Sequence, residues 1–384
     1  MAGIYFHIPF CKTRCIYCDF FSSSNQSKKK EYIEAMCREL ADRKDYLKGQ
    51  AIETIYFGGG TPSQLSAEDF EKIFGTLEEH LDDKEITLEA NPDDITPLYL
   101  DSIQHLPFNR ISLGVQSFND SELQFLNRRH NAQAAIQAVK LCQEYGYKNI
   151  SIDLIYGLPN QSLTIWQENI QQAIRLNIQH VSAYHLTYEP DTKLFDLWEN
   201  QKIQAIDENL SIQMFEVLID TLTEAGFRQY EISNFAQPSF ESKHNSAYWK
   251  GVHYLGIGSS AHSYNGISRQ WNSKSEEYHT FQPEIEMIDE KMAYNDFVIT
   301  RMRTMKGINL DELQSLFGEE TKAHFLLEAQ KHILNQSLEL TDNHIRLTRK
   351  GIFISDGVMS DLMLFSAQHK REITIDNVNR NEHK

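Results

Sequence analysis

The stretch YFHIPFCKTRCIYC, which runs from Tyr5 to Cys18, decides how this chain folds and points to its chemistry. It begins as an apolar strand and continues into a loop that carries Cys11, Cys15 and Cys18 within eight residues. One loop can direct all three thiols at one object. Three thiolates without a fourth cysteine nearby suit a [4Fe-4S] cluster with one iron left open, whereas a structural zinc site needs a fourth tight ligand. His7 is available for zinc, but it lies in the strand before the loop.

Outward from this stretch, β-branched apolar runs alternate with helix-like segments. The alternation predicts parallel strands joined by crossover helices, and six successive units favour an α/β fold, a partial (β/α)6 barrel, over a mixed sheet. The expected strands are Ile4–Ile8, Thr54–Phe57, Glu85–Ala90, Arg110–Val115, Asn149–Ile155 and His180–Leu186. The expected helices include Glu31–Tyr46, Ala67–Leu81, Ala132–Tyr145 and Thr164–Leu176.

Polar residues follow each expected strand, at the point where the strand ends. In a barrel of parallel strands the chemistry lies at these carboxyl ends. The cysteines follow the first strand, Gly58–Pro62 the second, and Glu89 closes the third, while Gln116 follows the fourth and Asp153 lies in the fifth. Any one of these features alone would be ordinary turn chemistry, but together they predict one functional rim.

Beyond residue 190 the pattern weakens, and we expect three parts in the chain: a barrel over 1–235, an aromatic and glycine-rich extension over 236–290, and a C-terminal domain over 291–384. A helix is expected at Asp207–Ala225 and a strand at Phe227–Ile232. The last part has the order of a small α+β, winged-helix-like domain and ends in a polar tail from Gln368. Its elements are expected at Ala293–Thr304, Thr321–Asn335, Leu338–Leu340 and His344–Thr348.

The charge argues against nucleic acid as a partner. The formal net charge is −17, with 37 basic and 54 acidic residues. From Lys291 onward 13 basic and 13 acidic residues cancel, so the winged-helix-like part is neutral rather than basic. No run of about 18 apolar residues predicts a membrane span, and no targeting segment is evident. Five cysteines in a chain of 384 residues make a disulfide scaffold improbable and favour a reducing cytoplasm.

The motif Cys-x3-Cys-x2-Cys after a first strand resembles that of radical S-adenosylmethionine (SAM) proteins. Four stretches extend the resemblance to one branch, the oxygen-independent coproporphyrinogen III oxidases and their relatives, the HemW family of haem chaperones. These stretches are YFHIPFC at 5–11, GGGTP at 58–62, GVQSF at 114–118 and DLIYGLP at 153–159. The resemblance covers nearly the whole chain. It implies a [4Fe-4S] cluster on Cys11, Cys15 and Cys18, with SAM bound at its open iron.

The same resemblance implies which residues flank SAM: Tyr5, Tyr17, Gly59, Gly60, Thr61, Glu89, Gln116, Arg128 and Asp153. By side-chain type, Arg128 can pair with the SAM carboxylate, and Glu89 and Asp153 can accept from ribose hydroxyls or the amino group. The alternative to a SAM-binding role for the glycines is that they form a tight strand-to-helix turn. The alternative for Arg128 is that it lies at a solvated helix end. A carboxylate inside an apolar strand, such as Asp153, needs a partner.

Phe20 separates the two branches. In the oxidases a fourth cysteine stands two residues after the third, whereas here Phe20 stands at that place, as in the chaperones. The segment His244-Asn245-Ser246-Ala247-Tyr248-Trp249 matches an HNxxYW signature associated with the chaperone family. The resemblance therefore implies haem binding near His244, Tyr248 and Trp249, since imidazole can ligate iron and aromatic rings can cover a porphyrin.

A buried, hydrogen-bonded histidine among core aromatics is the alternative for His244. The rival iron ligands are His7, His185, His253 and His262.

The implied function is a haem chaperone that binds haem, the cluster and SAM and transfers haem to acceptor proteins. The alternative is radical oxidative decarboxylation of coproporphyrinogen III propionates. We also expect an electron donor protein if SAM is cleaved, and the chain is compatible with a homodimer.

Overall fold

The computed structural model describes residues 1–77, 80–275 and 283–364, so the polar tail expected from Gln368 lies outside the described residues. Contacts divide the chain into two compact units, Met1–Met287 and Ile288–Lys384. Residues 236–275 and 283–287, which the sequence pattern sets apart from the barrel, are part of the first unit.

In the described chain, one sheet of twelve strands forms the frame of the first unit, in the order β12-β11-β10-β9-β1-β2-β3-β4-β5-β6-β8-β7. Its six central strands are parallel, which confirms the six expected strand–helix units. They are β1 (Ala2–Ile8), β2 (Ile52–Gly59), β3 (Glu85–Ala90), β4 (Arg110–Gln116), β5 (Ile150–Tyr156) and β6 (His180–His185).

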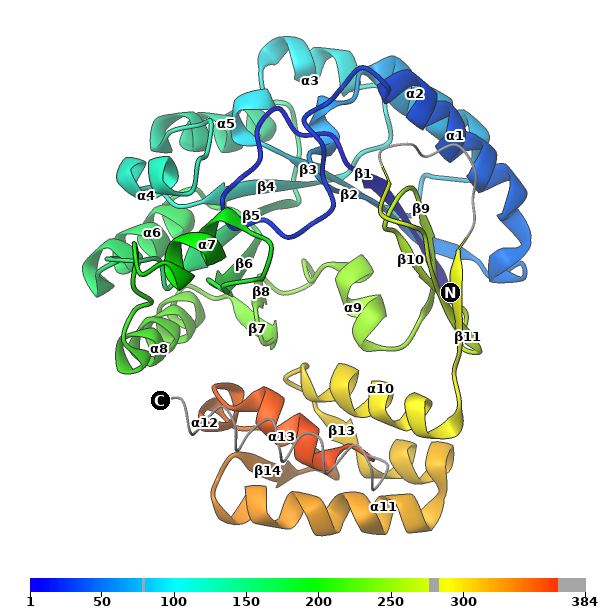
Figure 1. Cartoon of the computed structure of the whole chain (residues 1–384), viewed down its shortest axis with the longest axis vertical. Helices are drawn as coiled ribbons and strands as arrows, with labels where there is room; N and C mark the ends of the chain where they lie inside the picture. The colour runs from blue at the N-terminus through cyan, green and yellow to red at the C-terminus, as the bar shows by residue number, and fades with distance from the viewer. Residues whose placement is uncertain (78–79, 276–282, 365–384) are drawn as a thin grey trace. The chain divides into compact units, whose positions relative to one another are not determined.

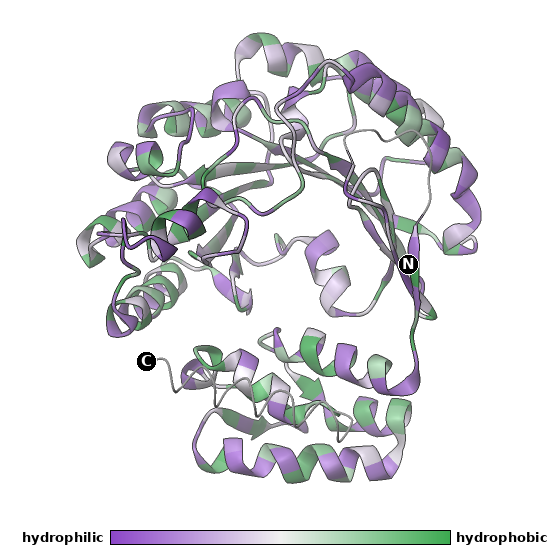
Figure 2. Ribbon diagram, in the orientation of Figure 1, coloured by the Kyte–Doolittle hydropathy of each residue, from purple (hydrophilic) through white to green (hydrophobic). Residues whose placement is uncertain are grey.

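Helices cover the outer face of these strands and carry both hydrophobic and hydrophilic residues, as amphipathic helices do (Figures 1 and 2). Local sequence starts several of them: Ser66 and Asp69 form a capping box at α2, and Asp207 caps α8. The helices are α1 (Lys29–Asp42), α2 (Ala67–Thr76), α3 (Pro97–Ile103), α4 (Asp120–Phe125), α5 (Ala132–Glu144), α6 (Leu163–Arg175) and α8 (Glu208–Glu224), whereas α7 (Lys193–Glu199) packs on the loop that carries the cysteines. The helix expected at Ala67–Leu81 thus ends at Thr76, and residues 78–79 lie outside the described part.

The sheet continues past both edges of the six-stranded core. The strand expected at Phe227–Ile232 is present at Arg228–Glu231, whereas the other added strands were not predicted from the sequence. Antiparallel strands β8 and β7 extend it beyond β6, and β9 joins the other edge parallel to β1. These added strands have three to five residues each, too short for a recognisable alternation. They are β7 (Arg228–Glu231), β8 (Asn234–Ala236), β9 (His253–Ile257), β10 (His262–Tyr264), β11 (Ser268–Trp271) and β12 (Glu284–Met287).

The strands present apolar side chains to the helices and polar ones to the barrel interior. In β4 the sequence Arg-Ile-Ser-Leu-Gly-Val-Gln alternates without exception. Ile111, Leu113 and Val115 are fully buried, whereas Ser112 and Gln116 line an interior cavity. Since successive side chains point to opposite faces, a slip by one residue would exchange the two sets. The register of the sheet therefore places the polar side chains inside.

Helix α9 (Lys243–Trp249) lies on the inner, concave side of the sheet, unlike α1–α6 (Figure 1). The carboxylate of Glu85, at the start of β3, accepts the backbone N–H groups of Lys243 and His244 at 3.1 and 3.0 Å. A carboxylate at a helix N-terminus satisfies orphan donors and complements the helix dipole. No helix was predicted in this aromatic stretch.

The second unit has the element order of a winged helix. Strand β13 (Ile308–Asn309) pairs with β15 (His344–Leu347), which also pairs with β14 (Leu338–Thr341). Asp342 and Asn343 both have positive φ, as a two-residue hairpin turn requires. The helices are α10 (Glu290–Met302), α11 (Leu310–Leu334), α12 (Arg349–Ile352) and α13 (Ser355–Leu362).

Helix α11 is two helices joined at Gly318, whose φ of 85° and ψ of 172° are not helical. The pattern predicted only the second of them, from Thr321. Across the described residues of the whole chain, no helix is both long and apolar enough to cross a bilayer.

Candidate functional site

A cavity of about 490 Å³ opens at the carboxyl ends of the central strands in the first unit. All three motif cysteines line it, and so do eight of the nine residues expected around SAM. The ninth, Tyr5, is absent from its wall. The eight are Tyr17, Gly59, Gly60, Thr61, Glu89, Gln116, Arg128 and Asp153. These residues come from chain segments that are far apart in sequence, from Cys11 to Asp153. The parallel sheet brings them together because the carboxyl ends of its strands lie at one edge.

The loop that carries the cysteines is held at its beginning, middle and end. The backbone N–H of Cys11 donates to the carbonyl of Ser23 at 2.9 Å. In the middle, Ile16 is buried in an apolar cluster with Leu126 and Leu194, and its carbonyl accepts the Leu194 N–H at 2.8 Å. At the end, the imidazole of His7 is hydrogen-bonded to the carbonyl of Phe21 at 2.9 Å. His7 thus anchors the loop.

Two hydrogen-bond donors approach the motif sulfurs. The hydroxyl of Thr61 donates to the sulfur of Cys11 at 3.3 Å, and the guanidinium of Arg128 donates to the sulfur of Cys15 at 3.2 Å. Burial raises the pKa of the Cys11 thiol, and it raises that of Cys18 to about 11. These two groups are therefore neutral thiols at pH 7 in the metal-free chain, and iron ligation must displace their protons.

Within the described ranges, no three Cys, His or carboxylate side chains meet closely enough to share one metal ion. The three cysteines instead line a shared cavity, with donors directed at two of the sulfurs and a cationic guanidinium beside one. This donor set fits a thiolate-ligated, electron-rich iron–sulfur cluster, whose sulfurs are stabilised by hydrogen bonds.

The glycines after β2 let the backbone pass close to the cysteine loop. Gly60 donates its N–H to the carbonyl of Ile8 at 2.8 Å, and a Cβ atom at Gly60 would lie 2.7 Å from the carbonyl carbon of Pro9. At Gly59 the φ of 106° excludes ordinary side chains. The segment is thus both a tight turn and part of the cavity wall, so the two readings of its sequence are compatible.

Two partly buried carboxyl groups, those of Glu89 and Asp153, lie on the cavity wall. Glu89 accepts the phenol O–H of Tyr56 at 2.6 Å, and burial, with a contribution from Asp153, raises the pKa of Glu89 to about 7. Burial likewise raises the pKa of Asp153 to about 6. Near neutral pH these carboxyl groups exchange between the protonated and the ionised form. The protonated form can donate a hydrogen bond to a polar ligand, and the ionised form accepts one.

Arg128 is the main cation directed at this wall. Besides Cys15, it donates to the side-chain oxygen of Asn91 and to the carbonyl of Gly114. Asn91 was not among the predicted site residues, although its place directly after β3 was a signal for it. Gln116, at the end of β4, adopts a positive φ of 68° beside a register shift in the ladder. This irregular strand end turns the amide toward the cavity, which it lines.

Tyr5 lies behind the cavity wall rather than on it. Its ring stacks on that of Tyr56 with 6.1 Å between centroids, and its hydroxyl is hydrogen-bonded to His7 at 3.2 Å. A Cβ atom at Gly58 would lie 3.0 Å from the Tyr5 ring and 3.1 Å from the Glu89 carboxylate. The structure therefore places Tyr5 as a support for the residues that form the wall.

His244, Tyr248 and Trp249 lie on α9 and do not line the cysteine cavity. His244 is 2% exposed, and its two ring nitrogens are hydrogen-bonded to Thr54 at 2.7 Å and to Tyr248 at 2.9 Å. Its ring also stacks on Tyr56 at 4.9 Å. Burial lowers the pKa of His244 to about 3, so the imidazole is neutral. In this arrangement His244 offers no unbonded nitrogen to an iron.

The rival histidines differ in position. His7 is buried and hydrogen-bonded through both ring nitrogens, to Tyr5 and to Phe21. His253 is hydrogen-bonded to Gln50 at 2.6 Å, and His262 on β10 stacks on Trp271 of the neighbouring strand β11. Of these histidines, His185 at the end of β6 is the one that lines the cavity.

Comparison with known proteins gives the class that this fold and cavity define. Residues 5–173 match the model of the radical SAM superfamily, and residues 288–354 match the HemN C-terminal domain, so this is a radical SAM protein. The sequence is 32% identical to the heme chaperone HemW of Lactococcus lactis over 371 residues, which are 94% of this chain and 97% of the relative. The chain belongs to the HemW family.

Other comparisons agree with this placement. The identity to the heme chaperone HemW of Bacillus subtilis is 36% over 277 residues, covering 71% of this chain and 73% of the relative. Among solved structures, the coproporphyrinogen III oxidase HemN from Escherichia coli matches with a TM-score of 0.81 at 22% identity. That match covers 95% of this chain and 90% of HemN and shows a shared fold. The resemblance inferred from the motifs is thereby confirmed.

Proposed function

We propose that this protein is a haem chaperone that binds a [4Fe-4S] cluster, SAM and haem and transfers the haem to acceptor proteins. The observation that carries the proposal is the composition of the cavity wall. Three thiols without a fourth cysteine share it with the guanidinium of Arg128 and the carboxyl groups of Glu89 and Asp153, among other polar groups. The HemW family membership supports the haem-related role, because the curated relatives are named heme chaperones.

Cys11, Cys15 and Cys18 would hold the cluster. When bound, a cluster with one open iron supplies a coordination position for SAM and an electron for its reductive cleavage. Around it, Thr61 and Arg128 direct hydrogen bonds at two of the cysteine sulfurs. Such donors stabilise the charged, ligating form of the thiolates.

The remaining wall residues suit SAM. Arg128 supplies a cation for its carboxylate, and Gly59 and Gly60 allow close approach of the backbone. Glu89 and Asp153 offer oxygens to the amino group or the ribose hydroxyls. Their pKa values are about 7 and 6, and a positively charged ligand bound beside them would favour their ionised forms. Tyr17 and Gln116 complete the wall, and Tyr5 supports it.

For haem we propose the α9 segment, with His244, Tyr248 and Trp249 as the contributing residues. The neutral imidazole of His244 is the form that ligates iron. Because Thr54 and Tyr248 occupy its ring nitrogens, ligation requires one of these hydrogen bonds to break. Haem binding at this segment is therefore coupled to a rearrangement of α9.

Oxidative decarboxylation of coproporphyrinogen III is the second candidate function. The fold shared with HemN favours it. Against it stands Phe20, which lines the cavity with a 63% exposed ring at the position where the oxidases carry a cysteine. An electron donor, a homodimer and a cytoplasmic location stay predictions from the sequence.

The test uses full-length protein, purified without oxygen and reconstituted with iron and sulfide. Haem is added at one equivalent and followed by its Soret band, and a parallel reaction contains coproporphyrinogen III, SAM and a reductant. Retained haem that moves to an apo-acceptor, with no decarboxylated product, is the expected result. Product formation without haem retention would overturn the chaperone proposal in favour of the second candidate.

A further inference from the structure

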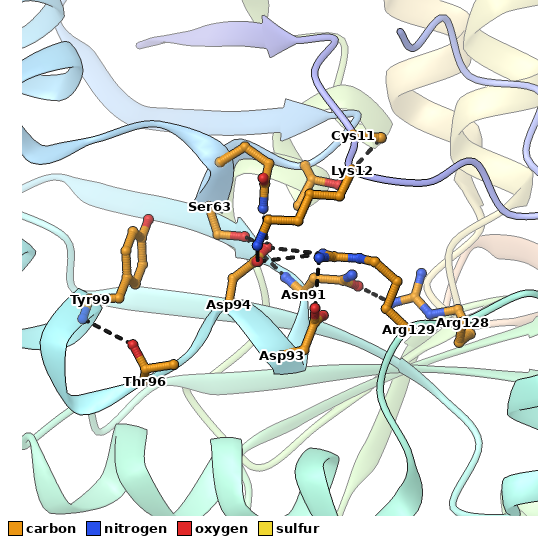
Figure 3. A network of polar contacts seen from close by, with 12 residues as sticks. Cys11, Lys12, Ser63, Asn91, Asp93, Asp94, Thr96, Tyr99, Arg128 and Arg129 are labelled. Carbon is orange, nitrogen blue, oxygen red and sulfur yellow. Dashed lines mark hydrogen bonds and ion pairs between the residues drawn. The ribbon is translucent and has the colours of Figure 1, made fainter. Parts of the chain in front are cut away.

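The carboxylate of Asp94 lies at the centre of a polar network that joins three segments of the site (Figure 3). Asp94 is 7% exposed and follows β3 in the short turn Pro92–Asp94. Its oxygens accept from Lys12 at 2.7 Å, from Ser63 at 2.8 Å and from Gln64 at 2.5 Å. Arg129 adds weaker contacts at 3.3 and 3.4 Å.

Each partner of Asp94 belongs to a segment that also touches a cysteine. Lys12 follows Cys11 directly. Ser63 and Gln64 come just after Thr61, whose hydroxyl donates to the Cys11 sulfur. Arg129 follows Arg128, which donates to the Cys15 sulfur. None of the four partners is itself a ligand candidate.

The network continues directly to the cavity wall. The hydroxyl oxygen of Ser63, which donates to Asp94, also accepts the backbone N–H of Asn91 at 3.2 Å. The side-chain oxygen of Asn91 in turn accepts from Arg128. One buried carboxylate thus connects the cysteine loop, the turn after β2 and the arginine of the wall.

We propose that Asp94 is a positioning residue that holds the cysteine loop in place for the cluster and SAM, acting through Lys12, Ser63, Gln64 and Arg129. The role rests on the proposed function, since it concerns the same three cysteines. Charge-assisted hydrogen bonds are the strong ones, and those to a buried acceptor are weakly screened by salt. The Lys12 side chain is 51% exposed, so its ammonium group can return to solvent when Asp94 is replaced by asparagine. The loss therefore frees the loop without stranding a buried cation there.

The neighbouring Asp93 provides a matched control. It lies in the same turn and pairs with the same arginine, with 2.7 Å between its carboxylate and Arg129, but its contacts do not extend to Lys12, Ser63 or Gln64. Asp93→Asn removes one charge from the turn but leaves the ion pair between Lys12 and Asp94, which connects the turn to the cysteine loop. Asp94→Asn removes the charge on which that ion pair depends.

The first measurement is made on the metal-free full-length chain, where alkylation rates of individual cysteines are read by mass spectrometry. We expect Cys11 to react about tenfold faster in Asp94→Asn and in Lys12→Met, because a lost charge-assisted hydrogen bond of ordinary strength changes an opening equilibrium by about that factor. Asp93→Asn should stay within about twofold of the wild type, and buried Cys142 serves as the internal reference for global loosening.

The second measurement follows cluster-loaded protein by its loss of iron to a chelator and by the change that SAM causes in the electron paramagnetic resonance spectrum of the reduced cluster. Faster iron loss, by about tenfold, and a weakened SAM effect are expected for Asp94→Asn but not for Asp93→Asn. Equal Cys11 alkylation in the two aspartate variants, or acceleration of Cys142 to the same degree as Cys11, would overturn the positioning role. If the wild-type chain takes up no cluster, the proposed function fails, while the alkylation rates still decide the role of Asp94.

Discussion

The guanidinium of Arg128 lies 3.2 Å from the sulfur of Cys15, although the two residues are 113 positions apart. The same side chain contacts Asn91 and Gly114, so it spans the ends of β3 and β4 and reaches the cysteine loop. A cation placed in this way can serve both a ligated sulfur and a carboxylate bound next to it.

Replacing Arg128 by Met should weaken SAM binding to the cluster-loaded protein by about 10- to 100-fold, because hydrogen bonds to charged groups contribute about 1.5–3 kcal/mol. Equilibrium dialysis with labelled SAM measures the effect. Arg14→Met is the control: Arg14 also lines the cavity but donates to the carbonyl of Cys18 from an exposed position, and its loss should change binding by no more than about twofold. Unchanged affinity in Arg128→Met would exclude the proposed carboxylate contact.

Serine in place of Cys11, Cys15 or Cys18 should abolish stable iron and sulfide uptake, since each thiolate would ligate a different iron of the cluster. Iron and sulfide contents after anaerobic reconstitution provide the measurement. Cys142→Ser is the control, because Cys142 is buried on α5, away from the cavity wall. Iron uptake by any of the three motif variants at the wild-type level would contradict the assigned ligand set.

Glu89→Gln should make the ligand-free protein more stable at pH 8 than the wild type, with little difference at pH 4.5. Burial raises the pKa of folded Glu89 to about 7, above its ordinary value of 4.5, so the folded state binds the extra proton in this window. The stability linked to that proton is fully present below pH 4.5 and is lost as the pH rises through 7. Glutamine does not lose a proton, so the gain at pH 8 should be on the order of 1–3 kcal/mol.

Urea unfolding of the two proteins at pH 4.5, 6 and 8 measures this difference. The Tyr56 hydroxyl can still donate to a glutamine oxygen, so the comparison isolates the charge. A stability difference that does not vary with pH would mean that Glu89 is not held neutral by its surroundings.

His244→Ala should destabilise the protein by about 2–4 kcal/mol, because it leaves the buried hydroxyls of Thr54 and Tyr248 without a partner and removes a ring stacked on Tyr56. His253→Ala, which removes a half-buried ring from the start of β9, should have a smaller effect. Thermal unfolding of both variants provides the comparison. Haem binding at the wild-type level in folded His244→Ala protein would remove His244 from the haem site.

Much of the fold follows from local sequence. The six central strands were predicted because β-branched apolar runs of four or more residues recur between helical patterns, and such a pattern can be recognised without knowledge of the neighbouring strands. Of the added strands only β7 was predicted. Strands β8–β12 escaped prediction because they have three to five residues each, and they pair where a sheet edge offers them hydrogen bonds. Helix α9 has a local N-cap in Ser242, but its seven residues are too few for a recognisable helical periodicity; Glu85, more than 150 positions away, accepts two further N–H groups at its N-terminus.

The sequence by itself determined the three-cysteine loop, the polar strand ends and the family, because motif spacing and residue type are properties of the chain alone. Only the tertiary structure decided that Tyr5 supports the wall, that His244 is enclosed by Thr54, Tyr248 and Tyr56, and that Asp94 joins three segments of the site. These relationships depend on which side chains meet across strands far apart in sequence. That is set by sheet register and burial, neither of which a local pattern contains.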